Sequence, residues 1–186
     1  MIEVVAEINY WLAFCTIGLQ LVTAYLFIEY FFMREKYLAP YLARFGMFVI
    51  LLFGAVSVVL TLVYSEIFGF VPCGLCWLQR VFLYPLPVVA AITLLHKSTG
   101  AVRRVIADSG ITLSVLGAIV ALYQHYLQMG GSEFVACPTA GVGADCARRI
   151  LFEFGYITFP LMSATVFLFV IVTLLIYRRG VSREAD

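Results

Sequence analysis

Charged side chains are scarce in this chain: Asp, Glu, Lys and Arg make up 12% of its 186 residues, while hydrophobic residues make up 63%. A typical soluble domain is about 25% charged and about 45–50% apolar. A water-soluble chain of this length has too little interior to bury so much apolar surface, so the composition predicts an integral membrane protein. The net charge is only +1 and no basic patch is present, so nothing in the sequence points to nucleic-acid binding.

Alternating apolar and polar residues, the pattern that a membrane β-barrel needs, are also missing. The apolar residues instead form five runs, each close to the roughly 20 residues that a helix needs to cross the hydrocarbon core. Backbone groups in lipid must be bonded within their own segment, so we expect an all-α membrane protein. No Lys or Arg precedes the first run, which we expect to be retained and not cleaved as a signal peptide. The runs are 8–33, 45–64, 77–95, 110–127 and 157–177.

Lys and Arg are distributed unevenly between the loops. With five crossings, most of them lie on one side of the membrane, which the positive-inside rule makes the cytoplasmic side. We therefore expect a multi-pass protein of the cell (plasma) membrane, with its N-terminus outside and its C-terminus in the cytoplasm. The basic segments on the cytoplasmic side are 34–44, 97–104 and 178–183.

Four of the five cysteines fall in the two loops predicted to lie outside, where disulfides persist. Cys73 and Cys76 lie between the second and third runs, and Cys137 and Cys146 between the fourth and fifth. Cys15 lies inside the first run, where we expect it to be a small buried hydrophobic residue. The orientation was inferred from Lys and Arg alone, so the position of the cysteine pairs is independent support for redox chemistry on the outer side.

The first pair lies at the predicted start of a helix. Pro72 suits the first turn of a helix, and the positive end of the helix dipole favours the thiolate of a cysteine placed there. Arg80 follows Cys76 by four residues, which puts its guanidinium on the same helix face, about 6 Å deeper along the axis. An arginine at mid-bilayer costs roughly 2.5–3.5 kcal/mol. Arg80 is therefore either an anchor at the membrane interface or a group that holds a thiolate and an oxygen-bearing ligand together.

Other roles for the four cysteines remain open from the residues alone. Purely structural disulfides would explain the pairing but not Arg80. A tetrahedral zinc site is a further alternative, although the eight-residue spacer between Cys137 and Cys146 is unlike the short spacing of zinc knuckles. A c-type haem would need a histidine where Trp77 stands.

Three further features lie outside the cysteine pairs. His125 is close to the outer end of the fourth run, at a depth similar to that of Arg80, and is either a hydrogen-bonded interface residue or part of the same cavity. Glu29 lies one turn before Arg34, with which we expect it to pair at the inner edge of the membrane. Several glycines in the loop after the fourth run, together with Pro138, predict a mobile segment beside Cys137.

These residues resemble the signature of the DsbB/BdbC family of disulfide bond formation proteins. The resemblance is carried by Pro-Cys-Gly-Leu-Cys-Trp-Leu-Gln-Arg at 72–80 and Tyr-Pro at 84–85, and continues along the second half of the chain. The short loop between the second pair of cysteines is closer to the BdbC branch. The further matching segments are 123–128, 137–138, 146 and 155–160.

The resemblance implies a fold and a reaction. It implies a four-helix transmembrane bundle, to which this chain adds one N-terminal transmembrane helix. Such proteins reoxidise a thioredoxin-like (DsbA/BdbD-like) thiol oxidase outside the cytoplasm and pass two electrons to a membrane quinone, ubiquinone or menaquinone. By position, Cys137 would accept the partner's thiolate with Cys146 as its pair mate, while Cys73 and Cys76 would pass the electrons on, with Cys76 facing the quinone.

Arg80 matches the quinone-binding arginine of the family, and His125 aligns with a histidine near the quinone. The division of the chain that follows is 1–44 for the additional helix and its loop, 45–177 for the DsbB-like domain and 178–186 for a cytoplasmic tail. Gln79 replaces an acidic residue that some members have before the arginine. A quinone reductase similar to vitamin K epoxide reductase is the second enzymatic alternative, which the motif order and Arg80 disfavour.

Overall fold

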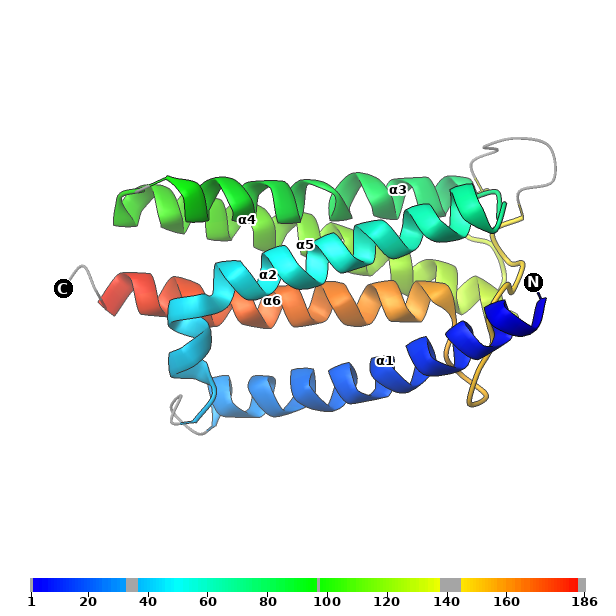
Figure 1. Ribbon diagram of the computed structural model, residues 1–186, viewed down its shortest axis with the longest axis horizontal. Helices are drawn as coiled ribbons and strands as arrows, with labels where there is room; N and C mark the ends of the chain where they lie inside the picture. Colours follow the sequence, from blue (N-terminus) through cyan, green and yellow to red (C-terminus); the bar gives the residue numbers. More distant parts are fainter. Residues whose placement is uncertain (1, 33–36, 97, 138–144, 184–186) are drawn as a thin grey trace.

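Long helices account for every predicted crossing of the membrane (Figure 1). The computed structural model describes residues 2–32, 37–96, 98–137 and 145–183, and within them it contains no β-strand. Five helical segments are long and apolar enough to span a bilayer, which confirms the predicted all-α membrane fold. The elements are α1 (Ile2–Phe31), α2 (Ala39–Leu62), the single π-helical turn η1 (Val63–Ile67), α3 (Gly74–Leu83), α4 (Pro85–Leu95), α5 (Gly100–Gln128) and α6 (Phe159–Arg183).

Two crossings differ in detail from the apolar runs. The third crossing is divided at Tyr84 into α3 and α4, because Pro85 has no N–H to continue the hydrogen-bond ladder. The helix of the fourth crossing begins at Gly100, ten residues before the apolar run, where the Thr99 side chain caps the N–H of Val102. Hydropathy marks only the part of a helix inside lipid, so it missed this polar first stretch of α5.

Helix α6 lies at the centre of the bundle and contacts α1, α2, α3 and α5. Its packing against α5 depends on a small residue: a Cβ added at Gly117 would lie 2.3 Å from Cζ of Phe167, which is completely buried. Small residues allow membrane helices to approach closely, and van der Waals contact is the main attraction between helices in lipid. Gly117 therefore sets the distance between α5 and α6.

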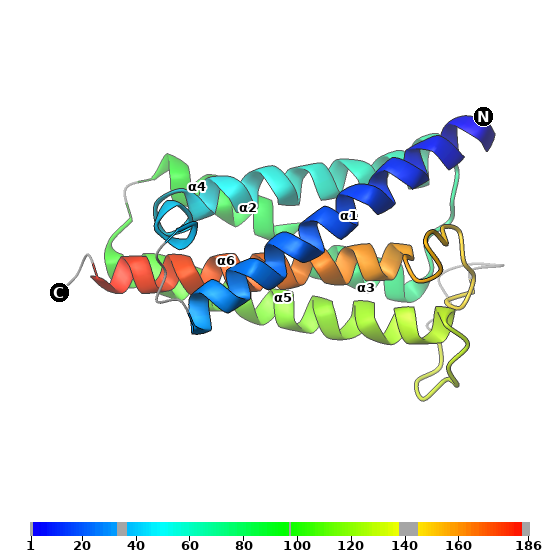
Figure 2. The ribbon, with the colours of Figure 1, turned by 90° about the horizontal axis from the view of Figure 1, so that it is seen from below.

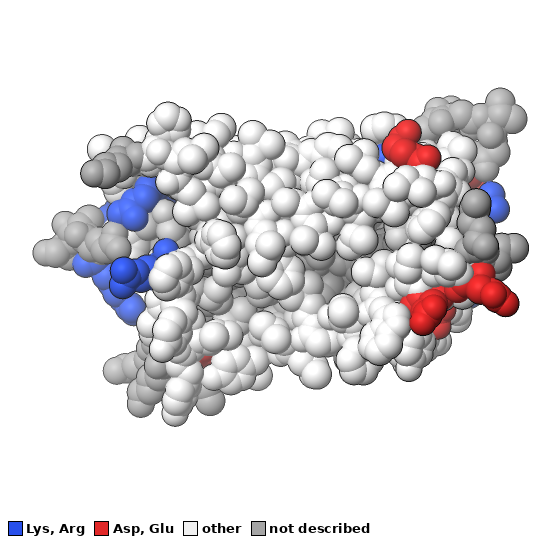
Figure 3. Space-filling view, viewed as in Figure 1, with Lys and Arg blue, Asp and Glu red and all other residues white. Residues whose placement is uncertain are grey.

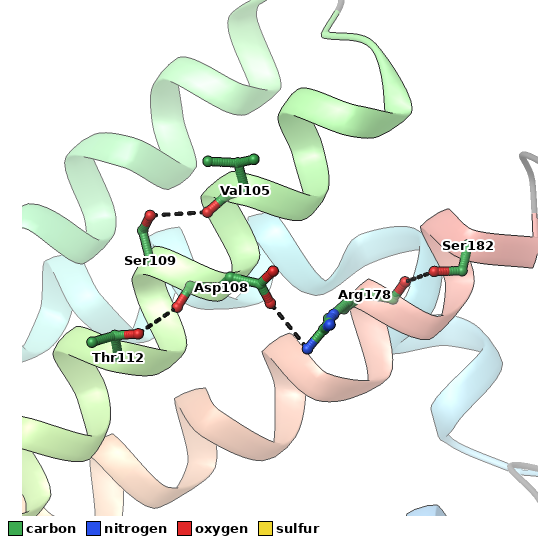
Figure 4. A network of polar contacts seen from close by, with 6 residues as sticks. All are labelled: Val105, Asp108, Ser109, Thr112, Arg178 and Ser182. Carbon is green, nitrogen blue, oxygen red and sulfur yellow. Dashed lines mark hydrogen bonds and ion pairs between the residues drawn. The ribbon is translucent and has the colours of Figure 1, made fainter.

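Charged residues gather at the two ends of the molecule and leave a broad uncharged belt between them (Figure 3). Blue Lys and Arg side chains predominate at the end that carries the C-terminus, and red Asp and Glu side chains at the opposite end. At the C-terminal end, Arg178 of α6 forms an ion pair of 3.0 Å with Asp108 of α5 (Figure 4). Both side chains are about half exposed, so this pair contributes at most about 1 kcal/mol.

Helix α1 runs obliquely across α6 (Figure 2) and is joined to the rest of the fold at its C-terminal end by Glu29. The buried Glu29 carboxylate accepts hydrogen bonds from the backbone N–H groups of Tyr37, Leu38 and Ala39, at 2.5, 2.9 and 3.2 Å. These N–H groups precede or begin α2. The N-cap of α2 is Leu38, whose apolar side chain cannot accept a hydrogen bond from them. Glu29 thus caps α2 from α1, while Arg34, its expected partner, lies outside the described residues.

Two polar residues of α1, Asn9 and Gln20, contact segments that adjoin the cysteine pairs. The Tyr64 hydroxyl in η1 donates to Asn9 Oδ1 at 2.5 Å, and both side chains are buried. Gln20 donates to Thr165 Oγ1 and accepts from the Tyr156 hydroxyl, each at 3.2 Å. Tyr64 precedes the Cys73 segment and Tyr156 follows the Cys146 segment, so α1 fixes one neighbour of each pair.

The expectation that Cys15 is buried was wrong. Cys15 is exposed on α1 and lines an apolar groove of about 440 Å³ between α1, α2 and α6. Helix α1 packs on the bundle along one face only, so an apolar residue elsewhere on this helix faces the surface that lipid covers. Hydrophobicity alone does not separate these two environments in a membrane helix.

Candidate functional site

Cys73 is the N-cap of α3, as the predicted helix start required. Its backbone is extended (φ −73°, ψ 171°), and its sulfur accepts a hydrogen bond from the backbone N–H of Cys76 at 3.4 Å. The first turn of α3 brings the two sulfurs to 2.9 Å, an unbonded contact from which a small movement forms the disulfide. A two-residue spacer at a helix start therefore places the two sulfurs where their disulfide can form and break with little movement.

Cys73 differs from the expectation that a helix N-terminus favours the thiolate. The side-chain hydrogen bond with Cys76, and after it burial, raise the pKa of the Cys73 thiol. The hydrogen bond with Cys76 and the burial of Cys73, which is 4% exposed, together outweigh the favourable helix end. The environment of Cys73 therefore favours its thiol form over its thiolate.

Arg80 lies one helical turn beyond Cys76 and is 8% exposed. Its Nη2 donates to the carbonyl oxygen of Thr61 at 2.9 Å, and its guanidinium carbon lies 5.0 Å from the centroid of the Trp77 ring. An interfacial anchor would extend its charged head into water. The burial of Arg80 argues against the anchor alternative and favours a group held inside the bundle beside the thiols.

The second pair is joined: Cys137 and Cys146 form a disulfide with a Cα–Cα distance of 6.0 Å. Cys146 is completely buried, and the backbone that follows it is fixed to the end of α5. Gln128 Nε2 donates to the carbonyl of Arg148 at 3.0 Å, and Arg149 Nε donates to the carbonyl of Gln128. The glycine-rich segment predicted to be mobile falls largely in 138–144, outside the described residues.

The Tyr123 hydroxyl fixes the loop before Cys137 to α5. The backbone N–H groups of Phe134 and Val135 donate to the Tyr123 hydroxyl at 3.2 and 2.9 Å, and this hydroxyl donates to the carbonyl of Val135 at 2.8 Å. Tyr123 belongs to the segment 123–128 that carried part of the family resemblance. Its role here is to hold the backbone that leads into the disulfide.

Both cysteine pairs belong to one apolar cluster at the same end of the bundle. Cys73 and Cys146 are buried in this cluster with Leu127, and Cys76 and Cys137 pack against it. The start of α3 and the loop after α5 lie at the end where the N-terminus is found, opposite the C-terminus (Figure 1). The fold thus brings together two pairs that are more than 60 residues apart in the sequence.

His125 forms its hydrogen bond with the segment that precedes α6. Its Nδ1 shares a hydrogen bond of 2.8 Å with Oγ1 of Thr158, just before α6. Within the described parts of the chain, no hydrogen bond or ion pair connects His125 with Arg80. The contact with Thr158 corresponds to the interface alternative and leaves a role at the quinone as a prediction.

Sequence reasoning missed one residue that touches both sulfurs. Gln124 Nε2 lies 3.1 Å from the sulfur of Cys73 and 3.2 Å from that of Cys76, and Gln124 is 2% exposed. Gln79 Nε2 in turn donates to Gln124 Oε1 at 2.6 Å. The sequence did contain a signal for this contact, because Gln79 and Gln124 are uncharged amides within apolar helices. A buried amide is costly without hydrogen-bond partners, so each of them was expected to bond to another polar group.

Comparison with known proteins decides the family. Residues 43–177 match the family model described as disulfide bond formation protein DsbB. The chain belongs to this family. The matched region is most of the chain and contains both cysteine pairs and Arg80.

Three relatives show how far the similarity extends. The SPbeta prophage-derived disulfide bond formation protein B of Bacillus subtilis is 41% identical over 108 residues, 58% of this chain and 68% of the relative. A probable disulfide formation protein of Oceanobacillus iheyensis is 33% identical over 126 residues (67% and 83%), and disulfide bond formation protein C of B. subtilis is 30% identical over 112 residues (60% and 77%). No solved structure matches this chain.

Membership in this family, together with the five spans, makes the chain a multi-pass membrane thiol:disulfide oxidoreductase. The arrangement of the two cysteine pairs is consistent with that activity. Helix α1 lies outside the matched region, although it contacts the segments beside both pairs.

Proposed function

We propose that this protein oxidises the thiols of an extracytoplasmic thioredoxin-like protein and passes the electrons to a membrane quinone, supporting disulfide bond formation in exported proteins. The observation that carries the proposal is the single buried cluster that contains Cys73 and Cys146, with Cys76 and Cys137 against it. Thiol–disulfide exchange needs the attacking sulfur to reach the sulfur it displaces. Two pairs in one cluster meet this condition with little movement.

The exchange begins at the second pair. A thiolate of the partner attacks Cys137: a mixed disulfide forms, the Cys137–Cys146 bond breaks, and the electron pair leaves on Cys146. The partner's second thiolate then attacks the partner's own sulfur, which releases Cys137 and leaves the partner oxidised.

The electrons then cross to the first pair. The Cys146 thiolate attacks Cys73, the Cys73–Cys76 bond breaks, and the electron pair leaves on Cys76. Attack of the Cys137 thiolate on Cys146 releases Cys73 and restores the Cys137–Cys146 disulfide. The first pair now holds two electrons and its protons as a dithiol.

Arg80 is the proposed quinone-binding residue, with His125 as a second candidate. A bound quinone would supply the terminal acceptor, because it takes up two electrons and two protons to become a quinol. The hydrogen bond from Arg80 to the carbonyl of Thr61 occupies one of the five guanidinium donors, which leaves others for a quinone oxygen. The aromatic Trp77 beside Arg80 adds an apolar surface of the kind that favours a ring.

The proposed orientation places the N-terminus and both cysteine pairs outside the cell. The Lys and Arg distribution supports this orientation, because basic residues predominate at the end that carries the C-terminus. The proposed division is an additional helix in 1–44, the redox domain in 45–177 and a cytoplasmic tail in 178–186. In intact cells, a membrane-impermeant maleimide should label a cysteine placed at exposed Glu3 and not one placed at exposed Arg178; the opposite labelling would reverse the topology.

The test of the reaction is turnover in reconstituted vesicles. Quinone should be reduced only when a reduced thioredoxin-like protein is supplied, and Cys76→Ser should abolish turnover. Cys15→Ser is the matched control, because Cys15 lies away from the cluster, and it should retain turnover. Quinone reduction that continues in Cys76→Ser would contradict the electron path.

A second test identifies the entry cysteine. In a Cys146→Ala variant the partner should be trapped on Cys137 as a mixed disulfide that a reducing agent releases. A purely structural or zinc-binding role predicts no such adduct; moreover, the Cys137–Cys146 disulfide leaves neither sulfur as a thiolate ligand for zinc. Trapping on Cys73 in place of Cys137 would reverse the order of the two pairs.

A further inference from the structure

The amide of Gln124 contacts both sulfurs of the first pair. Its Nε2 lies 3.1 Å from the sulfur of Cys73 and 3.2 Å from that of Cys76, so both sulfurs are within reach of an amide N–H donor. Gln124 comes from α5, whereas both cysteines belong to the start of α3. This contact therefore depends on tertiary packing and is not part of the Cys-x-x-Cys motif itself.

Gln79 fixes which end of this amide faces the sulfurs. The Gln124 Oε1 accepts a hydrogen bond of 2.6 Å from Gln79 Nε2, and Gln79 is itself 6% exposed. Because its oxygen accepts this short hydrogen bond, Gln124 presents its N–H groups to the sulfurs, and the oxygen itself lies farther from the Cys76 sulfur, at 3.7 Å. The reverse orientation would put two donors of the two amides against each other.

We propose that Gln124, oriented by Gln79, is a catalytic residue that stabilises the negative charge appearing on Cys76 when the Cys73–Cys76 disulfide opens. This inference rests on the proposed exchange between the two pairs. When a thiolate of the second pair attacks Cys73, one S–S bond forms, the Cys73–Cys76 bond breaks, and the electron pair leaves on Cys76. The N–H groups of Gln124 are then the donors that receive this thiolate.

An amide suits this position better than a charged group. Hydrogen bonds to an ionised atom are roughly twice as strong as those between neutral groups, and they gain strength where water is excluded. A second cation beside Arg80 would add the cost of another charge inside the bundle. The uncharged Gln79–Gln124 pair supplies directed N–H dipoles without that cost. Gln79 acts through Gln124 and is a positioning residue.

The direct measurement is the reduction potential of the Cys73–Cys76 pair. In a full-length Cys137→Ser/Cys146→Ser background, detergent-purified protein is equilibrated with dithiothreitol redox buffers, and the disulfide fraction is read by maleimide mass shift. Loss of the N–H donors in Gln124→Met destabilises the reduced form. The equilibrium constant should therefore shift about tenfold toward the disulfide, which lowers the potential by about 30 mV.

Two further variants separate this role from a structural one. Gln124→Met leaves the buried donor of Gln79 without an acceptor, so Gln79→Met/Gln124→Met removes both partners and restores packing. The double variant should keep the lowered potential of Gln124→Met. Gln20→Leu removes another amide of the membrane region, one that bonds Thr165 and Tyr156, and should leave the potential unchanged.

The rate at which the reduced pair reacts with a small maleimide is the second readout. It should fall several-fold in both Gln124 variants at pH 7, because the thiolate is the reactive form. An unchanged potential and an unchanged rate in the double variant would overturn the role of Gln124. A Cys73–Cys76 pair that forms no disulfide in any redox buffer would instead contradict the proposed exchange, so the two failures are distinguishable.

Discussion

The hydrogen bond between Asn9 and Tyr64 is the contact by which we expect α1 to stabilise the segment before the first cysteine pair. Each residue is 7% exposed, so replacing one leaves the polar group of the other buried without a partner. Hydrogen bonds between membrane helices are worth about 0.6 kcal/mol on average and about 1.7 kcal/mol at most. Burial on both sides favours the upper part of that range, and the polar group left without a partner adds to the loss, so each single substitution should cost about 1–2 kcal/mol.

A double-mutant cycle isolates this energy. Asn9→Leu and Tyr64→Phe should each lower the free energy of unfolding by about 1–2 kcal/mol, whereas the double variant should lose little more than either single variant. For a chain of this size, 1 kcal/mol corresponds to roughly 2–4 °C in melting temperature. Each single variant should therefore melt roughly 2–8 °C lower in detergent, as measured by the fraction that stays monodisperse after heating.

The same cycle can refute the reasoning. If the double variant melts at the temperature expected from adding the two single effects, the two side chains do not interact and α1 does not hold this segment. Ser65→Ala is a matched control one residue along: the Ser65 hydroxyl makes solvent-exposed hydrogen bonds to the carbonyl of Leu62 and to neighbouring Glu66. This substitution should change the melting temperature by less than about 2 °C, since exposed polar contacts contribute little.

Three other substitutions test separate parts of the structure. Arg80→Lys keeps the positive charge but loses the forked set of guanidinium donors. In vesicle turnover, the KM for quinone should therefore rise about tenfold while the KM for the protein thiol changes little. A rise confined to the KM for the protein thiol would show that Arg80 does not bind the quinone. Gly117→Leu should lower the yield of folded protein sharply, because its Cβ alone would lie 2.3 Å from Phe167, and normal yield would mean that α5 and α6 adjust freely. Asp108→Asn, which breaks the half-exposed pair with Arg178, should cost less than about 1 kcal/mol in the same melting assay, and a larger loss would show that this end contributes more than its exposure suggests.

The crossings and the cysteine pairs could be predicted because they depend on composition and spacing. Twenty apolar residues cross a bilayer whatever their neighbours are, and a Cys-x-x-Cys spacer closes within one helical turn. Pro85 also signals the break at Tyr84 in the sequence. Hydropathy is averaged over many residues, so the apolar run did not show the effect of this one proline. What the apolar runs cannot give is the rotation of each helix, and so Cys15 was wrongly assigned to the interior.

The contacts of Gln124 and Glu29 could not be predicted for a different reason. Each side chain bonds to groups on another helix or turn: Gln124 to sulfurs 48 and 51 residues away, and Glu29 to backbone N–H groups eight to ten residues ahead. Local pattern predicts that such a polar residue needs a partner but does not name it. For Glu29 the pattern named Arg34, the nearest opposite charge, whereas the described partners are the unsatisfied N–H groups at the start of α2.

Helix α1 lies outside the region that matches the family, and its polar contacts indicate what holds it on the bundle. Lipid offers α1 no hydrophobic gain for packing on α6, because its apolar residues are equally well solvated by acyl chains. Its position therefore depends on close packing and on polar contacts. These include the hydrogen bond from Arg179 to the carbonyl of Tyr30 and the contacts of Asn9, Gln20 and Glu29 with η1, α6, the loop after Cys146 and the start of α2. Asn9 and Gln20 contact the neighbours of the two cysteine pairs, so loosening α1 should alter how the pairs approach each other before it alters the bundle. On this reasoning, Asn9→Leu/Gln20→Leu should slow electron transfer between the pairs in single-turnover measurements, while the reduction potential of Cys73–Cys76 stays the same.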